Sequence, residues 1–201
     1  MRPEEIEQAS MAIIADEMGE WPGNAEDLPI VKRVVHTTAD FDFVRTLRFS
    51  EGAVPRGREA LRRGVTVVTD TAMAAAGISK EAASRWNVSV VCHMAEAEVR
   101  EEAEMRGTTR AVVSMERAAL ETPDAIFAIG NAPTALIHLC RLIRHGMAKP
   151  SLVIGVPVGF VNVVEAKEML SATDVHQICA MGRKGGSTVA AAIVNALLYG
   201  M

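Results

Sequence analysis

A histidine with two cationic neighbours offers the clearest proton chemistry in the sequence. His36 follows Lys32 and Arg33 by four and three residues, in a stretch whose apolar residues recur at helical spacing. Residues three and four apart share one side of a helix. The arrangement therefore predicts an imidazole that can move a proton, beside two cations that can hold carboxylates. A second interpretation stays open, in which His36 is an ordinary packed or surface side chain.

A glycine-rich cationic loop near the end of the chain has the composition of an anion-binding site. Residues 182–188 read GRKGGST and come directly before an Ala-rich helix. Backbone N–H groups at a helix start attract anions, and Arg183, Lys184 and Ser187 add side-chain donors. The loop does not match the Walker pattern G-x-x-x-x-G-K-[ST]. Its composition predicts binding of phosphate or carboxylate groups, and a nucleotide-binding enzyme that uses this loop is one alternative.

Polar side chains also follow two of the expected strands. Thr71 comes after the apolar run 65–69, and Asn131 lies in the turn between the run 124–129 and the helix expected over 135–145. In parallel α/β sheets, ligands bind beside the carboxyl ends of the strands. Thr71 and Asn131 are therefore candidate ligand contacts, although residues 130–133 also have the composition of an ordinary strand-to-helix turn.

Two further candidates depend on helix position alone. A first helix is expected over residues 3–18, where Ser10 falls on the apolar face. A hydroxyl at such a position either bonds back to the carbonyl one turn earlier or faces a ligand. Arg110 stands at the start of an amphipathic helix expected over 109–120.

The elements that must position these residues alternate along the chain. Strands are expected at 65–69, 88–92, 124–129, 151–156 and 176–180, with helices between them, and residues 41–49 suit either a helix or a strand. This alternation predicts an α/β fold with a mainly parallel five-stranded sheet and helices on both faces. No repeat or linker divides the chain, so residues 1–201 are expected to form a single domain.

Composition narrows the class of partner and the compartment. A net charge of −4 gives no general reason to expect nucleic acid or an acidic membrane surface. The three cysteines are far apart and lack a C-x-x-C pair, which indicates neither a disulfide framework nor a metal site. No apolar run has the roughly 18 residues of a membrane span, and the acidic start lacks a signal core. We therefore expect a soluble cytoplasmic protein.

Five blocks of sequence together resemble one known family. They are VKRVVHTT at 31–38, TDTAM at 69–73 with AGI at 76–78, IGNAPTAL at 129–136, PVGFV at 157–161, and GRKGGST at 182–188 followed by NAL at 195–197. In this order they resemble the precorrin-8X methylmutases, also called cobalt-precorrin-8 methylmutases. The family commonly has Glu-Ser-Lys after the fourth block, whereas this sequence has Glu165, Ala166 and Lys167. The missing hydroxyl puts a direct role for position 166 in doubt.

The resemblance implies an isomerase of cobalamin biosynthesis. Such an enzyme moves a methyl group from C-11 to C-12 of precorrin-8X or cobalt-precorrin-8, giving hydrogenobyrinate or cobyrinate. The resemblance further implies a homodimer without a cofactor of its own, and His36 as the catalytic proton donor. The acetate and propionate arms of this polycarboxylate corrin precursor would need polar contacts. The expected contacts are Ser10, Lys32, Arg33, Thr71, Arg110, Asn131, Arg183, Lys184 and Ser187. A non-catalytic corrinoid carrier is the other alternative.

Overall fold

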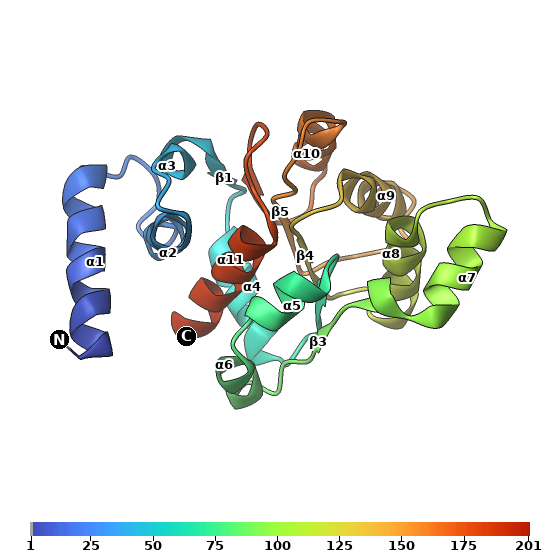
Figure 1. The fold of residues 1–201 in the computed structure, drawn as a ribbon, viewed down its shortest axis with the longest axis horizontal. Coiled ribbons are helices and arrows are strands. Elements are labelled where there is room, and N and C mark those ends of the chain that lie inside the picture. The colour runs from blue at the N-terminus through green and yellow to red at the C-terminus, as the bar shows by residue number, and fades with distance from the viewer. Residues whose placement is uncertain (1) are drawn as a thin grey trace.

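Residues 2–201 fold around one twisted six-stranded sheet (Figure 1). The computed structural model describes the backbone of residues 2–201 and the side chains of residue 2 and residues 5–201. The strand order is β1-β6-β5-β4-β2-β3. The bounds are β1 (Leu47–Phe49), β2 (Val67–Thr69), β3 (Val90–Val91), β4 (Ile126–Ile129), β5 (Leu152–Gly155) and β6 (Gln177–Ala180). All neighbouring strands are parallel except β1, which runs antiparallel to β6. The expected mainly parallel α/β sheet is confirmed.

The sixth strand corrects the expected count of five. Residues 41–49, which suited either structure, divide into the short helix α3 (Asp42–Thr46) and the edge strand β1. The strand is held at its two ends, where Met181 N–H donates to the Thr46 carbonyl at 2.9 Å and Ser50 N–H donates to the Gln177 carbonyl at 3.0 Å. The partner strand lies far away in sequence, so local pattern carries no signal for this pairing.

Helices cover both faces of the sheet. One face carries α2 (Leu28–Thr38), α4 (Ala53–Arg62) and α11 (Ser187–Tyr199), with the short helices α5 (Ala72–Gly77) and α6 (Lys80–Arg85) beside them. The other carries α8 (Arg110–Glu121), α9 (Pro133–Arg144) and α10 (Val163–Ser171), with η1 (His93–Ala95) and α7 (Ala97–Met105) outside α8. Within β4, Ile126 packs into the first core and Phe127 into the second, because successive strand residues point to opposite faces.

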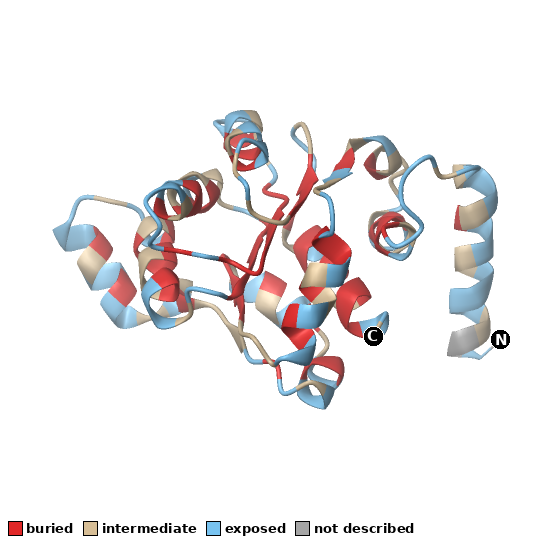
Figure 2. Cartoon of the chain, turned by 180° about the vertical axis from the view of Figure 1, so that it is seen from behind, coloured by how far each residue is buried: buried red, intermediate tan, exposed pale blue. Residues whose placement is uncertain are grey.

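Helix α1 (Pro3–Met18) stands at one end of the molecule, outside α2 (Figure 1). Its bounds match the expected range, and Gly19, with a φ of 68°, ends it. Figure 2 shows that α1 is exposed or half-buried over most of its length. Ile14 is its buried apolar residue, whereas Ile6 and Ile13 are exposed. Within residues 2–201, no helix is both long and apolar enough to cross a membrane.

Candidate active site

His36 lies on α2 and lines a cavity between α1 and α2. The cavity has a volume of about 290 Å³, and its lining includes Ser10, Ile13, His36 and Phe41. The imidazole is exposed, which leaves it accessible to a ligand. Ser10 Oγ donates to the Ile6 carbonyl at 2.9 Å, so the first of the two alternatives for this hydroxyl is the one observed. The structure nevertheless places Ser10 and His36 in one cavity.

Arg33 lies three residues before His36 on α2, and its side chain forms an ion pair with α1. Its Nη1 is 2.8 Å from Glu7 Oε1, and its Cζ is 5.6 Å from the ring centroid of Tyr199 at the end of α11. Lys32 is the half-buried residue one turn before His36. Neither Lys32 nor Arg33 lines the cavity of His36, and Arg33 is already paired to a carboxylate.

The glycine-rich loop between β6 and α11 is tied to the end of α2. Lys184 Nζ lies 2.6 Å from Asp40 Oδ2 and 2.7 Å from Asp42 Oδ2. The hydrogen bond from the Lys184 ammonium holds the pKa of each carboxyl below its usual value. This contact joins the loop to the segment that directly follows the helix of His36. Lys184 thus positions the two parts of the candidate site, and its charge is already paired.

Arg183 points away from these carboxylates towards a second loop. Its Cζ lies 5.6 Å from the ring centroid of Phe160, which is 85% exposed. The two loops approach closely, since Gly186 N–H donates to the Val156 carbonyl at 2.9 Å. A Cβ atom at Gly185 would lie 2.1 Å from the Val156 oxygen, so this close approach requires glycine. Arg183 therefore presents a cation on an apolar ring at the carboxyl edge of the sheet.

Thr71 and Ser187 meet at the same edge. Their hydroxyl oxygens are 2.8 Å apart, although 116 positions separate them in sequence. Thr71 also caps α5 by accepting a hydrogen bond from Ala74 N–H. Asn131 is exposed in the adjoining turn, where a Cβ on Gly130 would lie 2.7 Å from the Ser187 Cα. The structure thus joins Thr71 to Ser187 and places Asn131 in the turn next to them.

A buried carboxylate organises this turn. Asp70 is fully buried at the end of β2, and its oxygens accept the N–H groups of Gly130 at 2.8 Å, Asn131 at 2.8 Å and Ala132 at 2.6 Å. Burial raises the pKa of Asp70, while the three N–H groups act in the opposite direction. All three partners are donors, so the turn binds the carboxylate form. In the sequence Asp70 is only a polar residue at a strand end, and no pattern indicates that it accepts hydrogen bonds from this turn.

Arg110 lies away from the other predicted site residues. Its Nη1 donates to the Met94 carbonyl at 3.4 Å, and its helix, α8, lies across the sheet from α2 (Figure 1). The expectation for Arg110 rested on helix position alone. Within this single chain it stands apart from His36.

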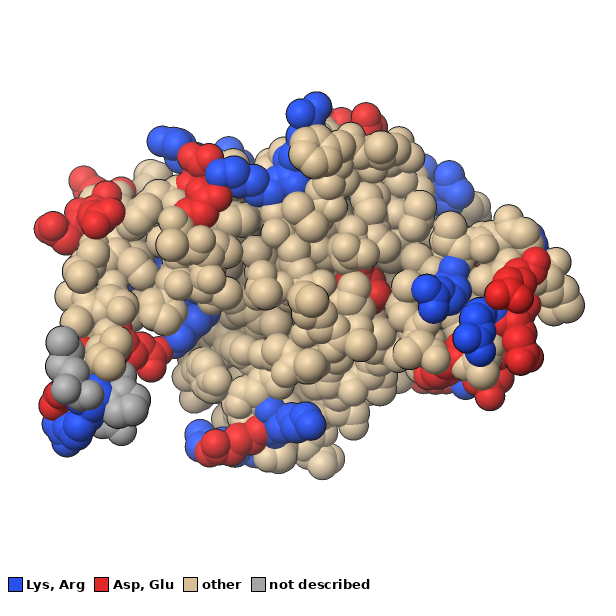
Figure 3. Space-filling view, viewed as in Figure 1, with Lys and Arg blue, Asp and Glu red and all other residues tan. Residues whose placement is uncertain are grey.

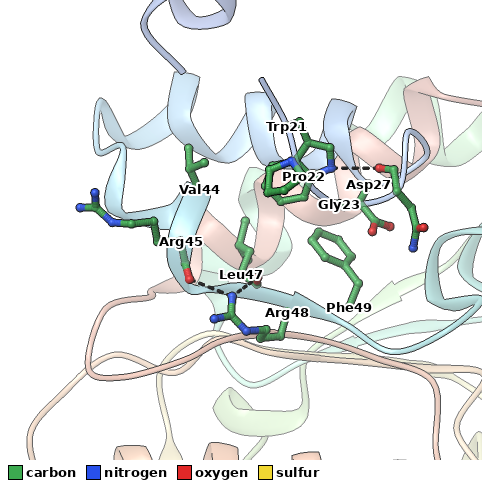
Figure 4. A pocket seen from close by; sticks show the side chains of 10 residues that line it. Trp21, Pro22, Gly23, Asp27, Val44, Arg45, Leu47, Arg48 and Phe49 are labelled. Atoms are coloured by element: carbon green, nitrogen blue, oxygen red, sulfur yellow. Dashed lines mark hydrogen bonds between the residues drawn. The ribbon is translucent and has the colours of Figure 1, made fainter. Parts of the chain in front are cut away.

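A larger cavity lies elsewhere, along the outer side of β1 (Figure 4). It has a volume of about 680 Å³, and none of the predicted site residues lines it. Arg48 is one of its lining residues and donates to the carbonyls of Arg45 and Leu47 at 2.7 and 2.9 Å. Size alone therefore does not identify the candidate active site. Among residues 2–201, no cluster of three or more His, Cys, Asp or Glu side chains is suited to hold a metal ion.

Charged side chains are unevenly spread over the surface. Figure 3 shows lysine and arginine along the rim near α3 and the β6–α11 loop, with acidic groups among them, and acidic groups beside arginines at the end formed by α7. The middle of this face, over α5 and α11, is largely without charge, and Met73 of α5 is exposed. The fold and the site together define an α/β protein that carries a histidine, hydroxyls and cations at its surface.

Comparison with known proteins identifies the family. The family profile of precorrin-8X methylmutase matches residues 5–200. The cobalt-precorrin-8 methylmutase of Priestia megaterium is 45% identical, over 98% of this chain and 88% of that protein. The precorrin-8X methylmutase of Pseudomonas aeruginosa is 41% identical, over 88% of this chain and 84% of that protein. A crystal structure of the precorrin-8X methylmutase from Thermus thermophilus superposes with a TM-score of 0.91 at 40% identity, covering 98% of this chain and 95% of that one.

The chain belongs to the precorrin-8X methylmutase family. Methylmutases are isomerases, and membership of this family places the protein among the isomerases of cobalamin biosynthesis. The family named from the five sequence blocks is thus confirmed.

Proposed function

We propose that this protein moves a methyl group from C-11 to C-12 of precorrin-8X or cobalt-precorrin-8, with His36 as the proton donor. The products are hydrogenobyrinate or cobyrinate. Family membership over residues 5–200 is the observation that carries the proposal. The accessible imidazole of His36 in the cavity beside α1 supports the assignment of the proton donor.

The reaction is an intramolecular rearrangement, so it needs neither an external methyl donor nor an external electron. A [1,5]-sigmatropic shift requires the ring tautomer in which the migrating methyl group meets a conjugated acceptor carbon. A proton or hydrogen bond from His36 to ring C selects that tautomer. A positioned general acid typically contributes about 10²- to 10⁴-fold in rate. We accordingly propose no cofactor.

The surrounding polar groups bind the carboxylate arms in this proposal. Arg183 is the best placed of them, because its guanidinium faces outward from the loop next to the α2 end. Arg33 and Lys32 lie on α2, three and four residues before His36, and bidentate binding of carboxylates is a property of arginine. The remaining proposed contacts are Ser10, Thr71, Arg110, Asn131, Lys184 and Ser187. Lys184 contributes only where a substrate carboxylate replaces Asp40 or Asp42 as its partner.

We further propose that the enzyme works as a homodimer in the cytoplasm. The cavity of about 290 Å³ beside His36 is smaller than the roughly 300–1,000 Å³ common for drug-sized ligands, and a corrin precursor is larger than those. The exposed Ile6 and Ile13 of α1 and the uncharged face over α5 and α11 offer apolar surface to a second copy. A partner subunit packed against these surfaces would add its own side chains to the lining of the substrate site.

The visible spectrum tests the proposed reaction, because the methyl shift extends the conjugation of the macrocycle. The purified protein is incubated separately with precorrin-8X and with cobalt-precorrin-8. Conversion of either one to the corrin spectrum supports the proposal and identifies the natural substrate. Tight binding of both without any spectral conversion would contradict it and favour a corrinoid carrier.

A further inference from the structure

Lys167 is a buried cation without a carboxylate partner among the described residues. It lies on α10 with 0% relative exposure and takes part in none of the ion pairs found in residues 2–201. Its Nζ donates to the carbonyls of Gly182 at 2.7 Å and Lys184 at 2.8 Å. A buried charge is costly unless hydrogen bonds satisfy it. The two carbonyls of the β6–α11 loop are the groups that satisfy this one.

The two carbonyls flank Arg183. Because both oxygens turn inward to Lys167, the backbone of the loop is fixed on either side of the arginine. Gly159 N–H fixes it at a third point by donating to the Arg183 carbonyl at 3.2 Å. With its backbone held in this way, Arg183 extends its exposed side chain over the ring of Phe160.

Arg183 carries the loop charge that no carboxylate neutralises in the described chain. Its neighbour Lys184 is bound to Asp40 and Asp42, whereas the guanidinium of Arg183 contacts only the face of Phe160 among the charged and aromatic interactions of residues 2–201. A guanidinium with free edges can take a carboxylate through two parallel N–H donors. Its usefulness depends on the direction in which the loop holds it.

We propose that Lys167 is a positioning residue for substrate recognition, which acts through Arg183. It holds the loop so that the guanidinium, supported on Phe160, faces a carboxylate arm of the corrin precursor. This inference rests on the proposed function. An apolar side chain at position 167 would leave the carbonyls of Gly182 and Lys184 without their shared donor, and the loop would turn them towards water. Arg183 would then lose its fixed direction.

A double-mutant cycle on corrinoid affinity tests this proposal. The dissociation constant of the substrate that the wild type converts is measured for the wild type, Lys167→Met, Arg183→Ala and the double variant, with Lys80→Met as control for an exposed lysine. We expect Arg183→Ala to weaken binding about 10-fold or more, the value of a hydrogen bond to a charged group. Lys167→Met should weaken it about 3- to 10-fold, and the double variant no more than Arg183→Ala alone. Saturating substrate should restore kcat in Lys167→Met to within about 3-fold, because KM carries the effect.

Additive losses in the double variant would overturn the proposal, since Lys167 would then act independently of Arg183. A fall in kcat without a change in KM would overturn it too. If Lys167→Met does not fold, Lys167→Gln replaces it in the same cycle, because an amide retains one donor group for the carbonyls. A wild type that converts no corrinoid would refute the proposed function itself, which distinguishes that failure from failure of the role of Lys167.

Discussion

Replacing Asp70 with asparagine tests how much of the carboxyl-edge geometry depends on one buried carboxylate. In the wild type, three backbone N–H groups point at the two carboxylate oxygens. Asparagine has nearly the same shape but only one acceptor oxygen, and its NH₂ group must face at least one of these donors. The best arrangement retains two hydrogen bonds, to Asn131 and Ala132, and leaves the Gly130 N–H facing a donor.

The expected cost follows from these contacts. One buried donor without an acceptor costs about 1–3 kcal/mol, and two hydrogen bonds that lose their charged acceptor weaken by about 1 kcal/mol each. The neutral side chain also avoids the desolvation cost that raises the Asp70 pKa, which offsets part of this loss, so Asp70→Asn should lower the free energy of unfolding by about 1–3 kcal/mol. A domain of this size is stable by about 5–15 kcal/mol, so we expect the variant to fold with a melting temperature roughly 2–12 °C lower.

Urea unfolding followed by circular dichroism measures this change. Asp16→Asn, on the exposed side of α1, is the matched control and should stay within about 0.5 kcal/mol of the wild type. An equally small effect for Asp70→Asn would refute the reasoning, because the turn of Gly130 and Asn131 would then not depend on the carboxylate.

Three further predictions follow from the same contacts. Gly185→Ala should lower the melting temperature or the soluble yield sharply, because its Cβ would lie 2.1 Å from the Val156 oxygen; a thermal melt like that of the wild type would contradict the close approach. Arg183→Ala should weaken corrinoid binding without lowering the melting temperature, as a spectral titration and a thermal melt can show together. Burial lowers the pKa of Lys167 from 10.5 to about 8, so unfolding takes up a proton between these values and stability rises with pH there. Between pH 8 and 10.5, the free energy of unfolding of the wild type, measured with urea, should rise by up to about 3 kcal/mol relative to that of Lys167→Met. The same pH dependence in both proteins would contradict this prediction.

Regular local signals predicted much of the fold. The first helix has its expected range because acidic residues begin it and a glycine ends it. The strands of the parallel core were expected because they are short apolar runs between helices. The helix expected between the first two strands is divided into two short helices within residues 72–85, because each begins at its own side-chain cap, Thr71 or Ser79. The edge strand β1 depends on pairing with a strand about 130 residues away, which no local pattern records.

The sequence predicted which residues belong to the candidate site, but it did not predict most of the contacts between them. Their position at strand ends predicted Thr71 and Asn131 as candidate contacts, whereas the hydrogen bond between Thr71 and Ser187, 116 positions apart, becomes visible only in the structure. The pairing of Lys184 with Asp40 and Asp42 was not predictable, because it joins segments about 140 residues apart. The same holds for Lys167, whose importance becomes visible only when its two carbonyl partners are known.

The most direct test of the central claim compares turnover and product binding in a His36→Ala variant. Conversion is followed by the change in visible spectrum, and affinity by titration with the corrin product, with His145→Ala at the exposed end of α9 as control. If His36 donates the proton, the variant should lose about 10²- to 10⁴-fold in turnover and bind the product as the wild type does. Unchanged turnover, or a loss of product binding in step with turnover, would contradict a catalytic role for His36.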